Sequence, residues 1–115
     1  MKGEGVKVIS RSDEILMLTI LRLKGNAYGV TIVKDVFKRT GKKLTFGSLW
    51  VSLDILHRRG YVAKTMGDPT PERGGRRKIY YTLTRKGIRA IQEAKEFQRA
   101  IWRGIPTVLK KYGQS

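Results

Sequence analysis

The sequence has no cysteine and only one histidine, His57, among its 115 residues. Without cysteine there is no disulfide framework, no thiolate metal ligand and no thiolate nucleophile. A lone histidine offers no second anchor for a metal site or for a Ser-His-Asp arrangement. The carboxylates are scattered, mostly beside basic residues, so no pair suggests acid–base catalysis. We therefore expect no enzymatic activity, no metal site and no cofactor.

Acidic residues are also scarce. The chain has 9 Asp and Glu against 25 Lys and Arg, which gives a formal net charge of +16. An excess of this size in a small domain predicts a polyanionic partner, with nucleic acid first and an anionic membrane surface second.

Long hydrophobic runs are missing as well. The longest uncharged run, residues 44–53, has ten residues and includes a threonine, a glycine and two serines, so it cannot span a bilayer. The first residues, MKGEGVKV, lack the apolar core of a signal peptide. We expect one domain with its own core, located in the cytoplasm and associated with the nucleoid.

Two helices with short links are predicted first. Ser12, followed by two acidic residues, is a candidate N-cap for a helix that ends at Gly25 and is apolar nearly all round over 15–23, which predicts burial. A second helix, over about 30–40, places Val33, Val36 and Phe37 on one face, and a glycine closes it.

The third predicted helix, over 45–59, is the one around which the chain is organised. Thr45 is a good N-cap and Gly60 a typical stop, and three leucines recur on one face. A helix of this length is about 22 Å long, enough to lie across a major groove. The alternative is an ordinary amphipathic surface helix. The side chains predicted to pack behind this helix are Leu49, Trp50, Leu53, Leu56 and Tyr81.

A hairpin follows. Residues 61–66 and 78–83 are rich in strand-forming residues, and 67–77 contains three glycines, two prolines and three arginines, which is typical of a loop. The order helix-helix-helix-strand-loop-strand predicts a winged helix-turn-helix. In that arrangement the third helix reads the major groove and the hairpin lies against an adjacent backbone or minor groove.

A long final helix is predicted from Arg85 to about residue 104, with Thr84 as its cap and a break near Pro106. One winged-helix domain does not need such a long apolar appendix, so the same helix of a second copy would cover it. The alternative is that it folds back on its own domain. The predicted interface residues are Ile91, Ala94, Phe97, Ile101, Trp102 and Ile105. Trp102 is interpreted as an interface anchor or, with its twofold mate, as a site for a flat aromatic effector.

Three segments resemble the PadR family of bacterial and archaeal transcriptional regulators. They are ILMLTILRLKGNAYGVTIVKDV, FGSLWVSLDILHRRGYV and RRKIYYTLTRKG. The resemblance implies a winged-helix dimer that is held by its C-terminal helix and usually represses a nearby gene. The short tail is similar to that of the family's compact subgroup. Trp50 stands where the family usually has Tyr, Val51 where Pro is common, and Asp54 at a position that is often basic.

These features predict a mainly α protein with a small β hairpin, a winged helix-turn-helix plus a long C-terminal dimerisation helix. Residues 1–11 would form a flexible basic arm, 12–84 the DNA-binding domain and 85–115 the dimerisation helix. The predicted function is a homodimeric, sequence-specific regulator of transcription, a repressor, bound to double-stranded DNA. The predicted DNA contacts are Lys42, Lys43, Thr45, Ser48, Val51, Ser52, Arg58, Arg73, Arg76, Arg77 and Lys78. The rival interpretations are a sequence-independent architectural DNA-binding protein and a winged-helix protein-interaction or RNA-associated module.

Overall fold

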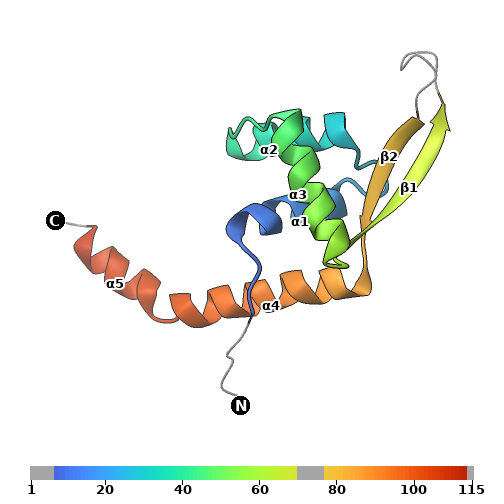
Figure 1. The fold of residues 1–115 in the computed structure, drawn as a ribbon. Helices are drawn as coiled ribbons and strands as arrows, with labels where there is room; N and C mark the ends of the chain where they lie inside the picture. The colour runs from blue at the N-terminus through green and yellow to red at the C-terminus, as the bar shows by residue number, and fades with distance from the viewer. Residues whose placement is uncertain (1–6, 70–76, 114–115) are drawn as a thin grey trace.

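Three helices and a two-stranded hairpin enclose the core, and a long helix runs along one end of them (Figure 1). The structure is a computed structural model, and it describes residues 7–69 and 77–113. The elements are α1 (Arg11–Arg22), α2 (Gly29–Thr40), α3 (Phe46–Arg58), β1 (Val62–Pro69), β2 (Arg77–Leu83), α4 (Arg85–Trp102) and α5 (Ile105–Tyr112). This order and packing are those of a winged helix-turn-helix, so the predicted fold class is confirmed.

The hydrophobic core lies between α1, α2, α3 and the base of the hairpin, with the first half of α4 closing it. The three leucines predicted to form one face of α3 are all buried, and so is the tyrosine of β2 that was predicted behind it. The largest buried side chains include Met17, Ile20, Ile32, Leu49, Leu53, Leu56 and Val62. The core therefore fixes which side of α3 faces outward.

Helix α1 differs from the prediction in two respects. The side chain of Ser10, not of Ser12, accepts a hydrogen bond from the amide of Asp13 at 3.1 Å, so the helix begins at Arg11. The prediction that this helix is buried all round is wrong, because Leu18 and Leu21 are 38% and 46% exposed. Neighbouring elements (α2, β2 and α4) pack against α1 and leave one side of it uncovered within a single chain.

Helices α2 and α3 begin and end close to the predicted positions. Gly41 closes α2 with a φ of 75°, in the left-handed region that favours glycine. Thr45 caps α3 by accepting from the amide of Ser48 at 3.2 Å. Phe37, predicted on the inner face of α2, is 48% exposed, since Ile32 and Val36 fill that face. The guanidinium of Arg22 on α1 also donates to Asp35 on α2, which fastens these two helices together.

The hairpin is longer than predicted. Strand β1 continues to Pro69, and β2 begins at Arg77, so both reach into the segment that was predicted to be loop. The strands pair antiparallel, with Thr65 opposite Tyr80, and the register is irregular between Met66 and Pro69. Glycine, aspartate and proline are poor strand formers, and an irregular ladder tolerates them. We call residues 62–83 the wing; its two strands, β1 and β2, project from the core as a twisted pair (Figure 1).

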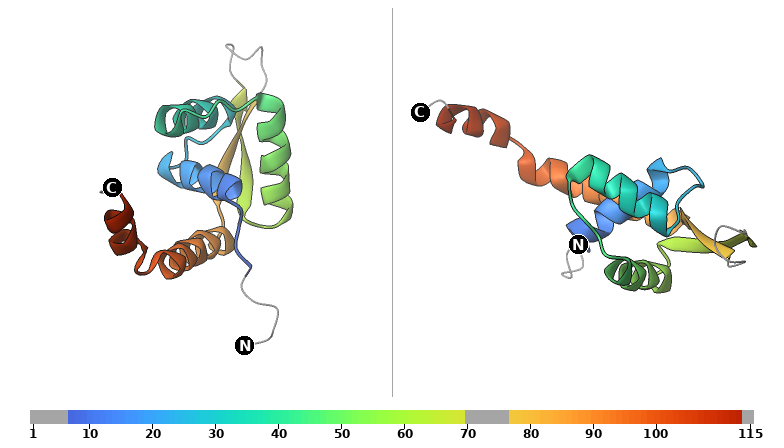
Figure 2. Two further views of the ribbon diagram at one scale, coloured as in Figure 1. Left: turned by 90° about the vertical axis from the view of Figure 1, so that its left-hand side faces the viewer. Right: turned by 90° about the horizontal axis from the view of Figure 1, so that it is seen from above.

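The final helix is broken where the sequence predicts. Thr84 caps α4 by accepting from the amide of Gly87 at 3.0 Å. Gly104, with a φ of 80°, separates α4 from α5, and Pro106 lies in the first turn of α5. In Figure 2, α5 lies at the far end of α4, away from the helices of the core.

Candidate nucleic-acid interface

The exposed face of α3 carries the side chains predicted to read base edges. Ser48 and Val51 are exposed, Val51 to 61%, and Ser52 is half-buried. The leucines on the opposite face are buried, so the helix cannot rotate without opening the core. The end of α3 that begins at Phe46 is held by the Thr45 cap.

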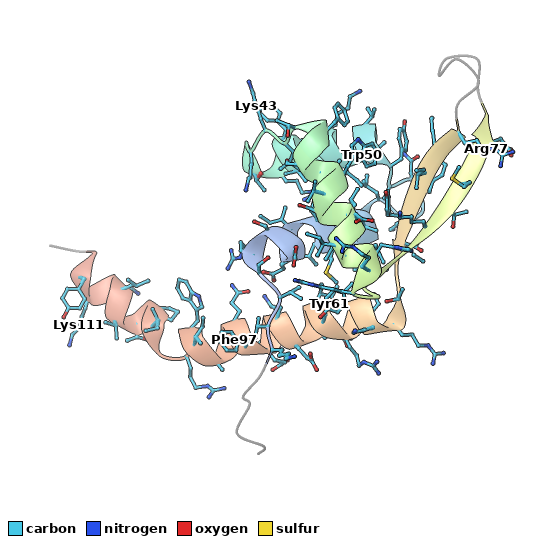
Figure 3. All side chains as sticks on the ribbon, viewed as in Figure 1. Lys43, Trp50, Tyr61, Arg77, Phe97 and Lys111 are labelled. Carbon is cyan, nitrogen blue, oxygen red and sulfur yellow. The ribbon has the colours of Figure 1, made fainter. Side chains whose placement is uncertain are left out.

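Two lysines lead into this helix. Lys42 and Lys43 are exposed in the connection between α2 and α3. The ammonium group of Lys43 lies 5.9 Å from the centre of the Phe37 ring, near the outer limit of a cation–π contact. Figure 3 shows Lys43 extending outward beside the N-terminal end of α3.

Arg58, at the far end of α3, is paired with an acidic residue of the same helix. Its Nε lies 3.1 Å from the Asp54 carboxylate, and both side chains are more than half exposed. An exposed pair of this kind contributes at most about 1 kcal/mol. The Asp54 carboxylate offsets the positive charge of Arg58 in the second half of α3. The main positive charge near the base-reading positions therefore comes from the lysines before the helix and from the wing.

Lys78 on β2 is held by aromatic side chains. Its ammonium group lies 4.4 Å from the centre of the Tyr28 ring and 3.4 Å from the Tyr28 hydroxyl. Tyr80 packs edge-on against Tyr28, with the ring centres 5.4 Å apart. Sequence reasoning selected Lys78 but missed this aromatic support. The only sequence signal for it is the presence of tyrosines both before α2 and on β2.

Arg77, another predicted contact of the wing, is exposed at the start of β2, and Figure 3 shows its side chain directed away from the core. Arg73 and Arg76 lie outside the described residues. In Figure 1 and the left view of Figure 2, the beginning of α3 and the outer ends of strands β1 and β2 lie toward the same end of the molecule, and α4 lies at the other.

Trp50 departs from its predicted place behind α3. It is 43% exposed, and its ring lies against Gly29 at the start of α2. Two indole atoms lie 3.0 and 3.2 Å from where a β carbon of Gly29 would be. The glycine makes room for the indole, which therefore packs between α2 and α3 at the surface and not in the core.

The residues predicted for a dimer interface divide into two groups. Ala94 is only 6% exposed and Ile91 is half-buried, both against their own domain. The other four, which are 38% to 57% exposed in the single chain, are Phe97, Ile101, Trp102 and Ile105. Beyond the predicted set, α5 continues the row of exposed large side chains with Val108, Leu109 and Tyr112.

The described residues contain no group of three or more His, Asp or Glu that could hold a metal ion. Over the same part of the chain, no helix is long and apolar enough to cross a membrane. A shifted pKa belongs to Tyr81, a residue of the core. Burial raises the pKa of the Tyr81 hydroxyl above its ordinary value, and the negative charge of Asp54 adds to that rise.

These features define a class: DNA-binding proteins that present a helix and a β wing to the duplex. The family model of the transcriptional regulator PadR-like family matches residues 17–93, and the chain belongs to that family. The family consists of transcription regulators. The resemblance of the three quoted segments is confirmed by this match.

Solved structures of transcriptional regulators have a similar fold. A PadR family transcription regulator from Clostridium difficile is 28% identical, and the match covers 87% of this chain and 96% of that one with a TM-score of 0.60. A PadR-like transcription factor from Bacteroides fragilis is 20% identical, with 84% and 88% covered and a TM-score of 0.71. A transcriptional regulator from Clostridium thermocellum is 23% identical, with 83% and 89% covered and a TM-score of 0.65. No protein of curated function matches the sequence.

Proposed function

We propose that this protein is a homodimeric repressor that binds a specific DNA sequence through α3 and the wing. The observation that carries the proposal is the exposed face of α3, with exposed Lys42 and Lys43 directly before the helix and the cations Arg77 and Lys78 on β2. Serine, threonine and valine side chains between these cations would contact base edges, and the cations would contact phosphates. The protein acts by binding and not by catalysis, in the cytoplasm and on the nucleoid.

The remaining predicted contacts have defined roles in this proposal. Ser48, Val51 and Ser52 are the base-reading positions, and Thr45 sets the start of the helix. Arg58 would exchange its Asp54 partner for a phosphate. Arg73 and Arg76, beside Arg77, would supply affinity without sequence preference because they belong to a glycine-rich segment.

The homodimer is proposed from the apolar residues of α4 and α5. Phe97, Ile101, Trp102 and Ile105 are 38% to 57% exposed in one chain. Fully burying a large apolar side chain contributes about 1.5–3 kcal/mol, so covering the exposed half of each of these four against a second copy gives roughly half of that per residue. A repressor of this shape would act by occupying a promoter that polymerase needs.

A flat aromatic effector, sandwiched between Trp102 and its twofold mate, is a second proposal. Trp102 is 46% exposed near the end of α4. A ligand there would change DNA affinity only if it preferred one spacing of the two α3 helices. Fluorescence quenching by planar aromatics that survives in Trp50→Phe but disappears in Trp102→Ala supports the site. If no compound of a varied panel quenches, Trp102 is an interface anchor only.

The test of DNA reading is selection of bound duplexes from a random pool, followed by comparison of selected and random duplexes at one fixed salt concentration. The proposal predicts affinity for the selected duplex at least about a thousandfold above that for random DNA. Equal affinities indicate an architectural DNA-binding protein. Little affinity for any duplex indicates an RNA-associated or protein-interaction module.

A further inference from the structure

The first half of α3 exposes apolar groups where a DNA-reading helix commonly exposes long polar ones. Residues 45–53 include no charged side chain and no Asn or Gln. Its largest exposed side chains are Phe46, Trp50 and Val51, which are 47%, 43% and 61% exposed. The rings of Trp50 and Phe46 both lie near Gly29, 3.0 and 3.6 Å from where its β carbon would be, which leaves the isopropyl group of Val51 as the apolar group that projects on its own.

Packing within the chain does not account for the exposed isopropyl group of Val51. The core-facing side of α3 is completed by Leu49, Leu53 and Leu56, each at most 1% exposed. Val51 lies two residues from both Leu49 and Leu53, which places it about 200° around the helix, on the outer side. An apolar side chain on the outer side of a strongly basic domain points to an apolar group within an anionic partner.

Duplex DNA offers one such group in the major groove, the C5-methyl of thymine. Guanine is usually read by a bidentate Arg or Lys, and adenine by Asn or Gln. The nearest cation on α3 is Arg58, which lies beyond Asp54 and is bound to it at 3.1 Å. The first half of the helix therefore has the chemistry to contact thymine methyl groups and lacks the chemistry for bidentate contacts to purines.

We infer that Val51 is a specificity-determining residue that reads a thymine methyl group, so that each preferred half-site contains thymine where α3 enters the groove. Ser48, one turn before Val51, adapts to either a donor or an acceptor and adds little selection of its own. This inference rests on the proposed function, because it concerns the same face of α3 bound to the same partner.

Replacing thymine by deoxyuridine in the selected duplex tests the inference directly. The exchange removes the methyl group and keeps the base-pairing edge unchanged. Each lost methyl contact should weaken binding of the full-length protein by about fourfold, from about 0.8 kcal/mol per buried carbon. One thymine in each of two half-sites then gives about 15-fold by the same arithmetic.

A variant identifies the reading residue. Val51→Ala should bind the two duplexes with nearly equal affinity. Val8→Ala, the same truncation of a valine that is 37% exposed outside α3, should keep the full methyl effect. Circular dichroism checks that each variant is folded.

Equal binding of the thymine and deoxyuridine duplexes by the wild type overturns the inference while leaving sequence-specific binding intact. A methyl effect that survives in Val51→Ala overturns it as well, because other residues would then read the methyl. If the selection returns no preferred duplex, the proposed sequence specificity fails first, and the inference falls with it.

Discussion

The carbonyl group of Tyr61 lies so close to Gly87 that a β carbon on the glycine would overlap the carbonyl oxygen. The amide of Thr84 also donates to that carbonyl at 3.0 Å, and the ammonium of Lys86 donates to the carbonyl of Arg59 at 2.8 Å. The start of α4 is thereby fastened to the end of α3. In a dimer joined by α4, this junction would set the distance and angle between the two reading helices.

Replacing Gly87 with alanine should therefore destabilise the protein by about 3 kcal/mol, because backbone atoms must move to admit the methyl group. Urea unfolding at one fixed protein concentration measures the change. Gly47→Ala is the matched control, since a β carbon there meets nothing within 4 Å. That variant should be stabilised by about 0.5–1 kcal/mol, as expected for Gly to Ala within a helix. Similar effects at both positions would contradict the close packing at Gly87.

A second prediction concerns Gly29 and Trp50. Gly29→Ala should destabilise the protein by about 1–3 kcal/mol, because the added methyl would lie 3.0 Å from the indole. Trp50→Phe shortens the ring and should relieve that crowding, so the double variant should be more stable than the sum of the single changes implies. Additive effects in the double-mutant cycle would show that the indole does not limit the space at Gly29.

The pH dependence of stability should carry the signature of Tyr81. Burial raises its pKa, with a further rise from Asp54, so the folded protein holds the hydroxyl proton more tightly than the unfolded chain does. This stabilisation is present in full below the ordinary tyrosine pKa of about 10 and is lost as pH rises through the higher folded-state pKa.

Wild-type protein should therefore lose stability above about pH 10 more steeply than Tyr81→Phe. Other groups that titrate in this range, lysines above all, are common to both proteins and cancel in the comparison. Tyr28→Phe serves as a second control, because Tyr28 is half-buried and outside the core. Parallel stability curves for wild type and Tyr81→Phe between pH 9 and 11 would contradict the prediction.

The wing cations should contribute affinity that does not depend on sequence. Replacing Arg73, Arg76 and Arg77 together with alanine should weaken binding to every duplex similarly and lower the salt slope by about 2–3. A triple replacement of three exposed cations of α4 removes the same charge from the other end of the molecule and should change the slope less. The control positions are Arg89, Lys95 and Arg99. An unchanged slope in the wing variant would mean that the wing does not contact phosphates.

Local capping and spacing made much of the fold predictable from sequence. Thr45 and the glycines at 41, 60 and 104 mark helix ends by local chemistry, and each acts where it was expected. The leucine spacing of α3 also predicted its buried face correctly, because leucines at this spacing lie on one side of a helix. These signals depend on neighbours in sequence and need no knowledge of tertiary contacts.

The predictions that were wrong concern residues whose positions depend on tertiary contacts. Ser10 and Ser12 are equally good caps in isolation, and the path of the chain into α1 decides between them. Trp50 was expected in the core, but the space beside Gly29 receives its ring at the surface. Strand β1 extends to Pro69 because β2 pairs with it across residues that are poor strand formers alone. Contacts with DNA or with a second chain also join residues that are not neighbours in sequence. For that reason the sequence could name candidate contact residues but not every residue that supports them.

The most direct test of the account is hydroxyl-radical footprinting of the selected duplex, combined with sedimentation of the protein–DNA complex. Two copies of the chain should occupy an inverted repeat, with two protected regions centred about one helical turn, or 34 Å, apart. That result would establish a twofold protein whose α3 helices enter successive major grooves. A complex with one copy, or a protected site without a dyad, would contradict the account.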